Sequence, residues 1–143
     1  MAPDGGTSDP QPDLLLRFKS ELSAVDESCA AVLGYLQPFA LDARTLHRTE
    51  VILEELVSNI VRHSSAKSMS IGASVRDGLV ELTVEDDGAP FDPFAAPDPE
   101  PFTSLEHAEL GGRGIVLVKS FSASTRYDRV RGRNRVTISV AGS

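Results

Sequence analysis

The apolar residues in the first half of the chain recur mostly at helical spacing. Between residues 24 and 37 they recur at three- and four-residue steps, which predicts one buried helix face that is closed by Pro38. A broader apolar stripe runs from residue 46 to residue 63 behind Asp42, a residue type that caps helix N-termini. The short apolar run at residues 14–18 predicts a buried strand ahead of both helices.

Apolar and polar residues alternate with a period of two in the middle of the chain. Residues 69–75 and 79–84 therefore predict two strands, each with one side facing a core. The dipeptide Asp77-Gly78 between them is a strong signal for a tight hairpin turn.

A long irregular segment follows this hairpin. Residues 89–110 contain five prolines and little periodicity, and a loop of this length inside a compact domain is usually functional or mobile. Apolar residues at 115–121 then predict a short helix, and residues 123–127 and 135–140 predict two closing strands joined at Gly132.

This order of elements predicts an α+β fold. Helices should pack on one face of a mixed, mainly antiparallel sheet, as a two-layer α/β sandwich. Residues 1–12 are rich in Pro, Gly and polar side chains, which predicts a disordered tail, and residues 13–143 form one domain.

Composition and charge narrow the range of functions. The net charge of −7 argues against direct binding of nucleic acid, since phosphates demand clustered Lys and Arg. Five arginines near the C-terminus are interpreted as a solvated face or a partner surface. These are Arg126, Arg129, Arg131, Arg133 and Arg135.

The single cysteine and the hydropathy of the chain add further limits. Cys29 excludes an internal disulfide and a multi-cysteine metal site, and its position among alanines predicts a buried, inert thiol. No signal peptide and no apolar stretch of about 18 residues is present, so we expect a cytoplasmic protein that does not enter a membrane.

The second predicted helix carries the first candidate chemistry. Glu55 and Asn59 are four residues apart and project from one face, and Arg62 and His63 continue that polar edge. An Asn carbonyl suits Mg²⁺, and a Glu one turn earlier can hold a metal-bound water or act as general base. The alternative is the solvated side of an amphipathic helix.

Two further motifs favour a ligand. Asp86-Asp87-Gly88 ends a strand, where a carboxylate can accept a hydrogen bond from an adenine amine and Gly88 permits close approach, although a plain turn is the alternative. The run Gly111-Gly112-Arg113-Gly114 before an apolar helix suits phosphate, and it matches neither the P-loop nor the Rossmann pattern.

The order of these motifs resembles a known superfamily. Glu55-x-x-x-Asn59-x-x-x-His63, then Asp86-x-Gly88 and Gly112-x-Gly114, resembles the ATP-binding fold of gyrase, heat-shock ninety chaperone, histidine kinases and mismatch-repair ATPases. Within this superfamily, the chain looks most like the anti-sigma factor serine kinases, because of its compact size and the sequence Glu-Leu-Val-Ser-Asn-Ile-Val-Arg-His-Ser. The resemblance covers about residues 14–140 and implies the Bergerat-type fold.

The resemblance also implies roles for particular residues. Glu55 would be the general base, Asn59 would bind Mg²⁺, Asp86 would recognise adenine, and Gly88 would shape the base pocket. Residues 89–110 would form the ATP lid. Further contacts to the nucleotide are expected from the polar edge and the glycine turn, namely Arg62, His63, Gly112, Arg113, Gly114 and Ile115.

Three departures from the family pattern stand out. Pro90 replaces the second glycine of the Asp-x-Gly-x-Gly motif, and Arg133-Asn134-Arg135 replaces a Gly-Thr strand start. The lid has no Lys or Arg between Pro90 and Gly112.

The resemblance implies a protein serine/threonine kinase that uses ATP and Mg²⁺. It would phosphorylate a small antagonist (anti-anti-sigma) protein, sequester a sigma factor and form a homodimer. One alternative is a nucleotide-switched binding module with little or no phosphoryl transfer. Others are a detached histidine-kinase catalytic domain and an α+β domain without ligand.

Overall fold

The computed structural model describes residues 12–95 and 112–142, with only the backbone described for Gly112 and Arg113. The elements follow in the order β1 (Leu14–Lys19), α1 (Ser23–Leu36), the 3₁₀ helix η2 (Gln37–Phe39), α2 (Ala43–His63), β2 (Ser68–Arg76), β3 (Leu79–Asp86), α4 (Gly112–Ser120), β4 (Ser122–Val130) and β5 (Arg133–Val140). The predicted strands and helices are thus present in the predicted order.

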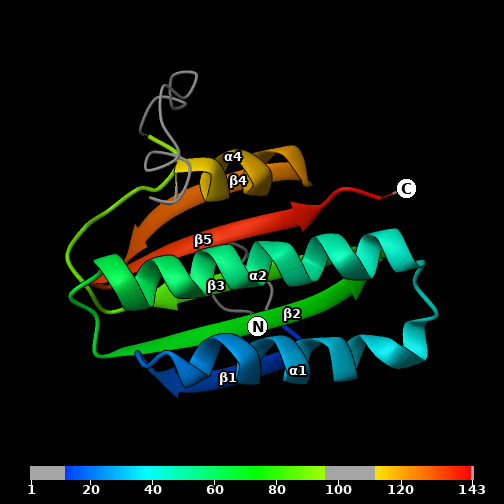
Figure 1. Ribbon diagram of the computed structural model, residues 1–143, viewed down its shortest axis with the longest axis horizontal. Helices are drawn as coiled ribbons and strands as arrows, with labels where there is room; N and C mark the ends of the chain where they lie inside the picture. Colours follow the sequence, from blue (N-terminus) through cyan, green and yellow to red (C-terminus); the bar gives the residue numbers. More distant parts are fainter. Residues whose placement is uncertain (1–11, 96–111, 143) are drawn as a thin grey trace, which may run out of the picture.

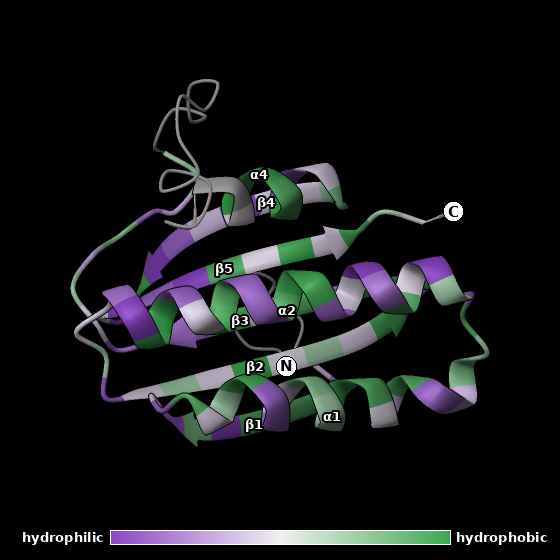
Figure 2. Ribbon diagram, in the orientation of Figure 1, coloured by the Kyte–Doolittle hydropathy of each residue, from purple (hydrophilic) through white to green (hydrophobic). Residues whose placement is uncertain are grey.

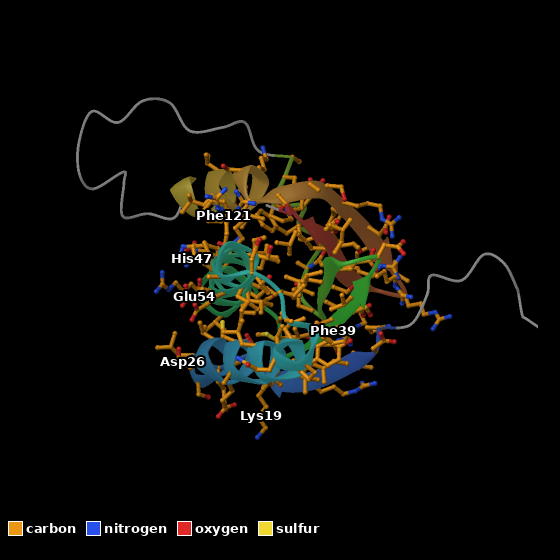
Figure 3. The ribbon with its side chains drawn as sticks, turned by 90° about the vertical axis from the view of Figure 1, so that its right-hand side faces the viewer. Lys19, Asp26, Phe39, His47, Glu54 and Phe121 are labelled. Atoms are coloured by element: carbon orange, nitrogen blue, oxygen red, sulfur yellow. The ribbon has the colours of Figure 1, made fainter. Side chains whose placement is uncertain are left out.

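The strands form one sheet in the order β1-β2-β3-β5-β4. Each of its four pairings is antiparallel, so the described sheet has no parallel pair. The helices α1, α2 and α4 lie side by side over one face, with α2 in the middle (Figure 1). Seen from the side, the molecule has one layer of helices and one layer of strands, as predicted (Figure 3).

The central helix α2 begins where the sequence predicted. Asp42 has an extended backbone, and its Oδ1 accepts a hydrogen bond from the backbone N–H of Thr45 at 2.8 Å. This bond satisfies one of the N–H groups that a helix start leaves unpaired. The helix ends at His63, and Ser64 returns to extended backbone.

Both hairpins are closed by two-residue turns in the left-handed region. Asp77 and Gly78 have φ values of 53° and 78°, and Arg131 and Gly132 have 55° and 77°. Positive φ at both central positions is the geometry that matches the twist of paired strands. The strands β4 and β5 extend to this second turn and are longer than the sequence predicted.

The first strand differs from its prediction. β1 was expected to be buried, but its residues alternate between half-buried and exposed, and Leu15 is 48% exposed. The reason is its place at the sheet edge, where it pairs only with β2 and one side faces solvent.

The core lies between the helices and the inner face of the sheet. Both hydrophobic and hydrophilic bands appear along α2, since one side of this helix packs on the sheet and the other is open (Figure 2). Truncating a fully buried leucine such as Leu53 typically costs about 2–5 kcal/mol. No helix in the described part of the chain has the length and hydropathy that a membrane span requires.

Candidate functional site

The C-terminal half of α2 and the end of β3 face one another across a cavity. Its volume is about 250 Å³. Apolar side chains make up most of its wall, and Asn59, His63, Asp86 and Asn134 contribute the polar groups with Ser64 and Ser65. The sequence-predicted residues Asn59 and Asp86, which are distant in the chain, therefore share one cavity.

Asp86 is held in a defined orientation. The residue is only 7% exposed, and its Oδ1 accepts hydrogen bonds from the backbone N–H of Gly88 at 2.8 Å and from Asn134 Nδ2 at 3.1 Å. The Ser64 hydroxyl lies 3.5 Å from the same oxygen. None of the described hydrogen bonds uses Oδ2, so this oxygen is available as an acceptor.

Gly88 is required by the tight bend after Asp86. A Cβ at this position would collide with Ser64 Oγ, and it would lie 2.9 Å from Asp86 Oδ1 and 3.1 Å from the backbone nitrogen of Ala66. The sequence prediction assigned Gly88 to close approach of a ligand. The structure shows that close approach of protein atoms already excludes a side chain there.

Asp87 does not line this cavity and instead bonds to the connection between α2 and β2. Its Oδ1 accepts from the backbone N–H groups of Lys67 at 2.7 Å and Ser68 at 3.1 Å, and its Oδ2 accepts from Ser68 Oγ at 3.0 Å. The backbone N–H groups of Ser68 and then Lys67 lower the pKa of this carboxyl below its ordinary value. The adjacent aspartates Asp86 and Asp87 therefore differ in position and contacts.

Asn134 belongs to the site, although it was noted in the sequence only as a departure from the family pattern. It is 4% exposed and lies opposite Asp86 in the β3–β5 register. The available signal was strand phase: Val136, Ile138 and Val140 share its inward side. An amide in an otherwise apolar series requires buried hydrogen-bond partners.

The arginine cluster near the C-terminus has two kinds of member. Arg133 pairs with Glu85 at 3.3 Å, and Arg126 and Arg135 pair with Asp128 at 3.3 and 3.1 Å, as expected of a polar outer face. For Arg129 the prediction of a solvated face or a partner surface was incomplete, because this side chain also contacts residues of the candidate site.

Arg129 is exposed but reaches the site. Its Nη1 donates to the Gly88 carbonyl at 2.8 Å and to Asn134 Oδ1 at 3.1 Å. In the register of β4 and β5, Arg129 pairs with Asn134 and lies on the opposite side from Arg126 and Asp128.

The glycine turn meets α2 one helical turn before Asn59. The sequence placed residues 112–114 ahead of a helix, whereas α4 begins at Gly112, so they form its first turn. A Cβ at Gly114 would collide with Glu55 Oε1 and lie 2.9 Å from Glu55 Cδ. The rise of 1.5 Å per residue separates Glu55 and Asn59 by about 6 Å along the helix.

The remaining predicted residues divide by position. His63 is exposed and lines the cavity, while Arg62 is exposed and does not line it. Ile115 is half-buried on α4. The side chain of Arg113 and residues 96–110, which the sequence analysis predicted to belong to an ATP lid, lie outside the described residues.

The described residues offer no metal site built from protein alone. No group of three or more His, Cys, Asp or Glu side chains among them is arranged to hold a metal ion. A single amide ligand such as Asn59 suits Mg²⁺, which binds few protein oxygens and completes its shell with phosphates and water.

Comparison with known proteins identifies the family. The family model described as "Histidine kinase-like ATPase domain" matches residues 18–140. The chain therefore belongs to the histidine kinase-like ATPase domain family, which implies that it binds ATP. The superfamily predicted from the motifs is thereby confirmed.

Individual relatives refine this assignment. The chain is 30% identical over 128 residues to the serine/threonine-protein kinase BtrW of Bordetella bronchiseptica, covering 82% of this chain and 89% of that protein. This match supports the predicted resemblance to small serine kinases of the anti-sigma factor type.

A solved structure shares the fold. It contains the RsbU and RsbW domains of Rv1364c from Mycobacterium tuberculosis, and it superposes with a TM-score of 0.64 at 17% identity. The match covers 92% of this chain but only 33% of that longer chain.

Proposed function

We propose that this protein is an ATP-dependent serine-protein kinase of the anti-sigma factor type. It phosphorylates a small antagonist protein and, in the alternative state, sequesters a sigma factor. The observation that supports this most is the shared cavity of Asp86 and Asn59, with Glu55 one helical turn away beside Gly114. The name of the BtrW relative, a serine/threonine-protein kinase, supports the choice of reaction.

The cavity fits the base of a nucleotide. Its 250 Å³ lies below the range of about 300–1,000 Å³ that is typical of complete ligand pockets. It therefore suits one ring system and leaves the phosphates outside. Apolar walls at Ile60 and Val84 suit the faces of the ring, and Asp86 Oδ2 accepts a hydrogen bond from the exocyclic amine of adenine.

Asn59 is the proposed Mg²⁺ ligand. Its side chain lines the cavity and is half-buried, on the side of α2 that continues toward Glu55 and Gly114. When bound, Mg²⁺ neutralises charge on the phosphates. Gly112, Arg113 and Gly114 are proposed to contact those phosphates at the start of α4, where backbone N–H groups favour anions. Arg62, His63 and Ile115 are proposed as outer contacts.

Glu55 is the proposed general base. Its carboxylate takes the proton from the acceptor serine hydroxyl as the serine Oγ bonds to the γ-phosphorus. The bond between that phosphorus and the bridging oxygen breaks, and ADP leaves with the electron pair. Gly114 makes room for this carboxylate, because any side chain there would occupy its position.

Two measurements test this function. Calorimetry with ATP in magnesium should show weaker binding for Asp86→Ala, through the base, and for Asn59→Ala, through the metal. Transfer of labelled phosphate to a candidate antagonist should fall at least 100-fold in Glu55→Gln, within the range of general-base effects. Glu54→Gln is the matched control, because Glu54 lies on the side of α2 remote from the sheet (Figure 3). Equal transfer by Glu55→Gln and wild type would remove Glu55 as base.

A nucleotide-switched binding module is the second candidate. Its support is the attachment of the proline-rich segment to the cavity wall, since the Phe91 N–H donates to Asn134 Oδ1 at 3.0 Å. A ligand in the cavity would contact both Phe91 and Asn134, because both line it. Partner affinity that differs between ATP and ADP without phosphorylated product would favour this candidate. We further propose that the protein forms a homodimer and acts in the cytoplasm.

A further inference from the structure

The Asn134 side chain uses both ends of its amide. Its Nδ2 donates to Asp86 Oδ1 at 3.1 Å and to the Ala89 carbonyl at 2.8 Å. An amide nitrogen has two N–H donors, so both are engaged. These two bonds connect β5 to the end of β3 and to the first residues of the proline-rich segment.

The amide oxygen accepts from three donors. Tyr127 Oη lies at 2.6 Å, the backbone N–H of Phe91 at 3.0 Å and Arg129 Nη1 at 3.1 Å. The Phe91 and Arg129 groups can only donate, so a flipped amide would direct N–H groups at N–H groups. The orientation of Asn134 is therefore fixed, with its nitrogen toward Asp86.

This orientation determines what Asp86 offers to a ligand. Oδ1 is occupied by the N–H of Gly88 and by Asn134 Nδ2, and rotation of the carboxylate would break both bonds. Oδ2 remains as an acceptor in a largely apolar cavity. The exocyclic amine of a purine can donate a hydrogen bond to this oxygen. An exocyclic carbonyl at the same place would bring two acceptors together and leave both without a donor.

We propose that Asn134 is the positioning residue that sets the base selectivity of this site. It acts through Asp86 and rests on the proposed binding of ATP. By holding Asp86 Oδ1, it makes the site select a purine with an amino group at C6, such as adenine, over one with a carbonyl there, such as guanine. By holding Ala89 and Phe91, it also fixes the wall opposite α2.

The experiment compares dissociation constants for ATP and GTP in three variants. Asn134→Leu keeps the side-chain size and removes every polar contact. Tyr127→Phe removes one of the three donors to Asn134 Oδ1 and leaves the hydrogen bond from Asn134 Nδ2 to Asp86. Ile138→Val tests weakened packing on the inward side of the same strand, away from the cavity.

The ratio of the dissociation constant for GTP to that for ATP should fall at least tenfold in Asn134→Leu. It should stay within twofold of wild type in Tyr127→Phe and Ile138→Val. Loss of packing alone would weaken both nucleotides together and leave the ratio unchanged. Hydrogen exchange adds a nucleotide-free readout: the Gly88 and Phe91 amides should exchange faster in Asn134→Leu and not in Ile138→Val.

The outcomes separate this inference from the proposed function. Wild type that fails to bind ATP would overturn both. Wild type that binds ATP selectively, with an unchanged ratio in Asn134→Leu, would overturn the role of Asn134 alone. Asn134→Leu protein that does not fold is replaced by Asn134→Ala, which removes both donors without adding a charge beside Asp86 and should lower the ratio in the same direction.

Discussion

Gly114, in the first turn of α4, lies directly against the carboxyl end of Glu55 on α2. An added Cβ would collide with Glu55 Oε1, so the Glu55 carboxylate can take this position only with glycine at position 114. The contact brings the glycine motif to the acidic motif, although the two are distant in the sequence. A single atom added to α4 should therefore change the position of the proposed base.

Gly114→Ala should reduce phosphoryl transfer by at least tenfold, because Glu55 must rotate away. A misplacement of about 1 Å can cost as much as 100-fold. ATP affinity should change less than transfer, since Glu55 is not among the residues that line the base cavity. Single-turnover transfer and calorimetry separate the two effects.

The control for this variant is Gly34→Ala. Gly34 lies in α1, and nothing occupies the 4 Å around a Cβ built there. Alanine is a better helix former than glycine by about 0.8–1 kcal/mol, so this change should stabilise the protein without affecting transfer. Equal transfer by the two variants would refute the proposed placement of Glu55.

Asp87→Asn should destabilise the fold in a pH-dependent manner. The backbone N–H groups of Ser68 and Lys67 lower the pKa of Asp87 below its ordinary value of 3.8. The stabilisation is thus complete above that value and is lost as the pH falls through the lower, folded pKa. The difference in urea midpoint between wild type and variant should be constant near pH 7 and shrink below about pH 4. A constant difference down to pH 2 would contradict this assignment.

Cys29 should be unreactive in the folded protein. Burial, with smaller effects from Glu54, Glu50 and Asp26, raises the pKa of its thiol to about 12. Only the thiolate attacks disulfide reagents, so the reaction at pH 8 should be at least 100-fold slower than in urea. Rapid labelling without urea would show that α1 opens from α2.

Arg48 should hold the C-terminus against the helix layer. Its Nη1 donates to the carbonyls of Ala141 at 3.0 Å and Gly142 at 2.9 Å, and its guanidinium lies 5.9 Å from the centre of the Phe121 ring. Arg48→Ala should cost about 1–3 kcal/mol in thermal or urea unfolding. The exposed Arg44 on the same helix provides the control, and Arg44→Ala should change stability by less than about 0.5 kcal/mol.

Local signals account for the elements that the sequence predicted well. Asp42 caps α2 through a neighbour three residues away, and Asp77-Gly78 forms its turn alone. Such features depend on adjacent residues. The spacing of Glu55 and Asn59 is equally local, because the helix itself fixes it.

The parts that the sequence did not reveal depend on distant contacts. Asn134 is 48 residues from Asp86, and Arg129 is 41 residues from Gly88. Only the register of β3, β5 and β4 brings them together. The edge position of β1, likewise, follows from the strand order, which no pattern within residues 14–18 contains.

The inner and outer faces of the sheet can vary independently. Along β3, Leu82, Val84 and Asp86 face the helices, while Glu81 and Glu85 carry the ion pairs on the opposite side. Because side chains alternate, replacing an outer residue leaves the inward packing in place. The side of the sheet that carries these ion pairs can therefore change in sequence during evolution, while the packing of the residues that face the helices, Asp86 among them, is kept.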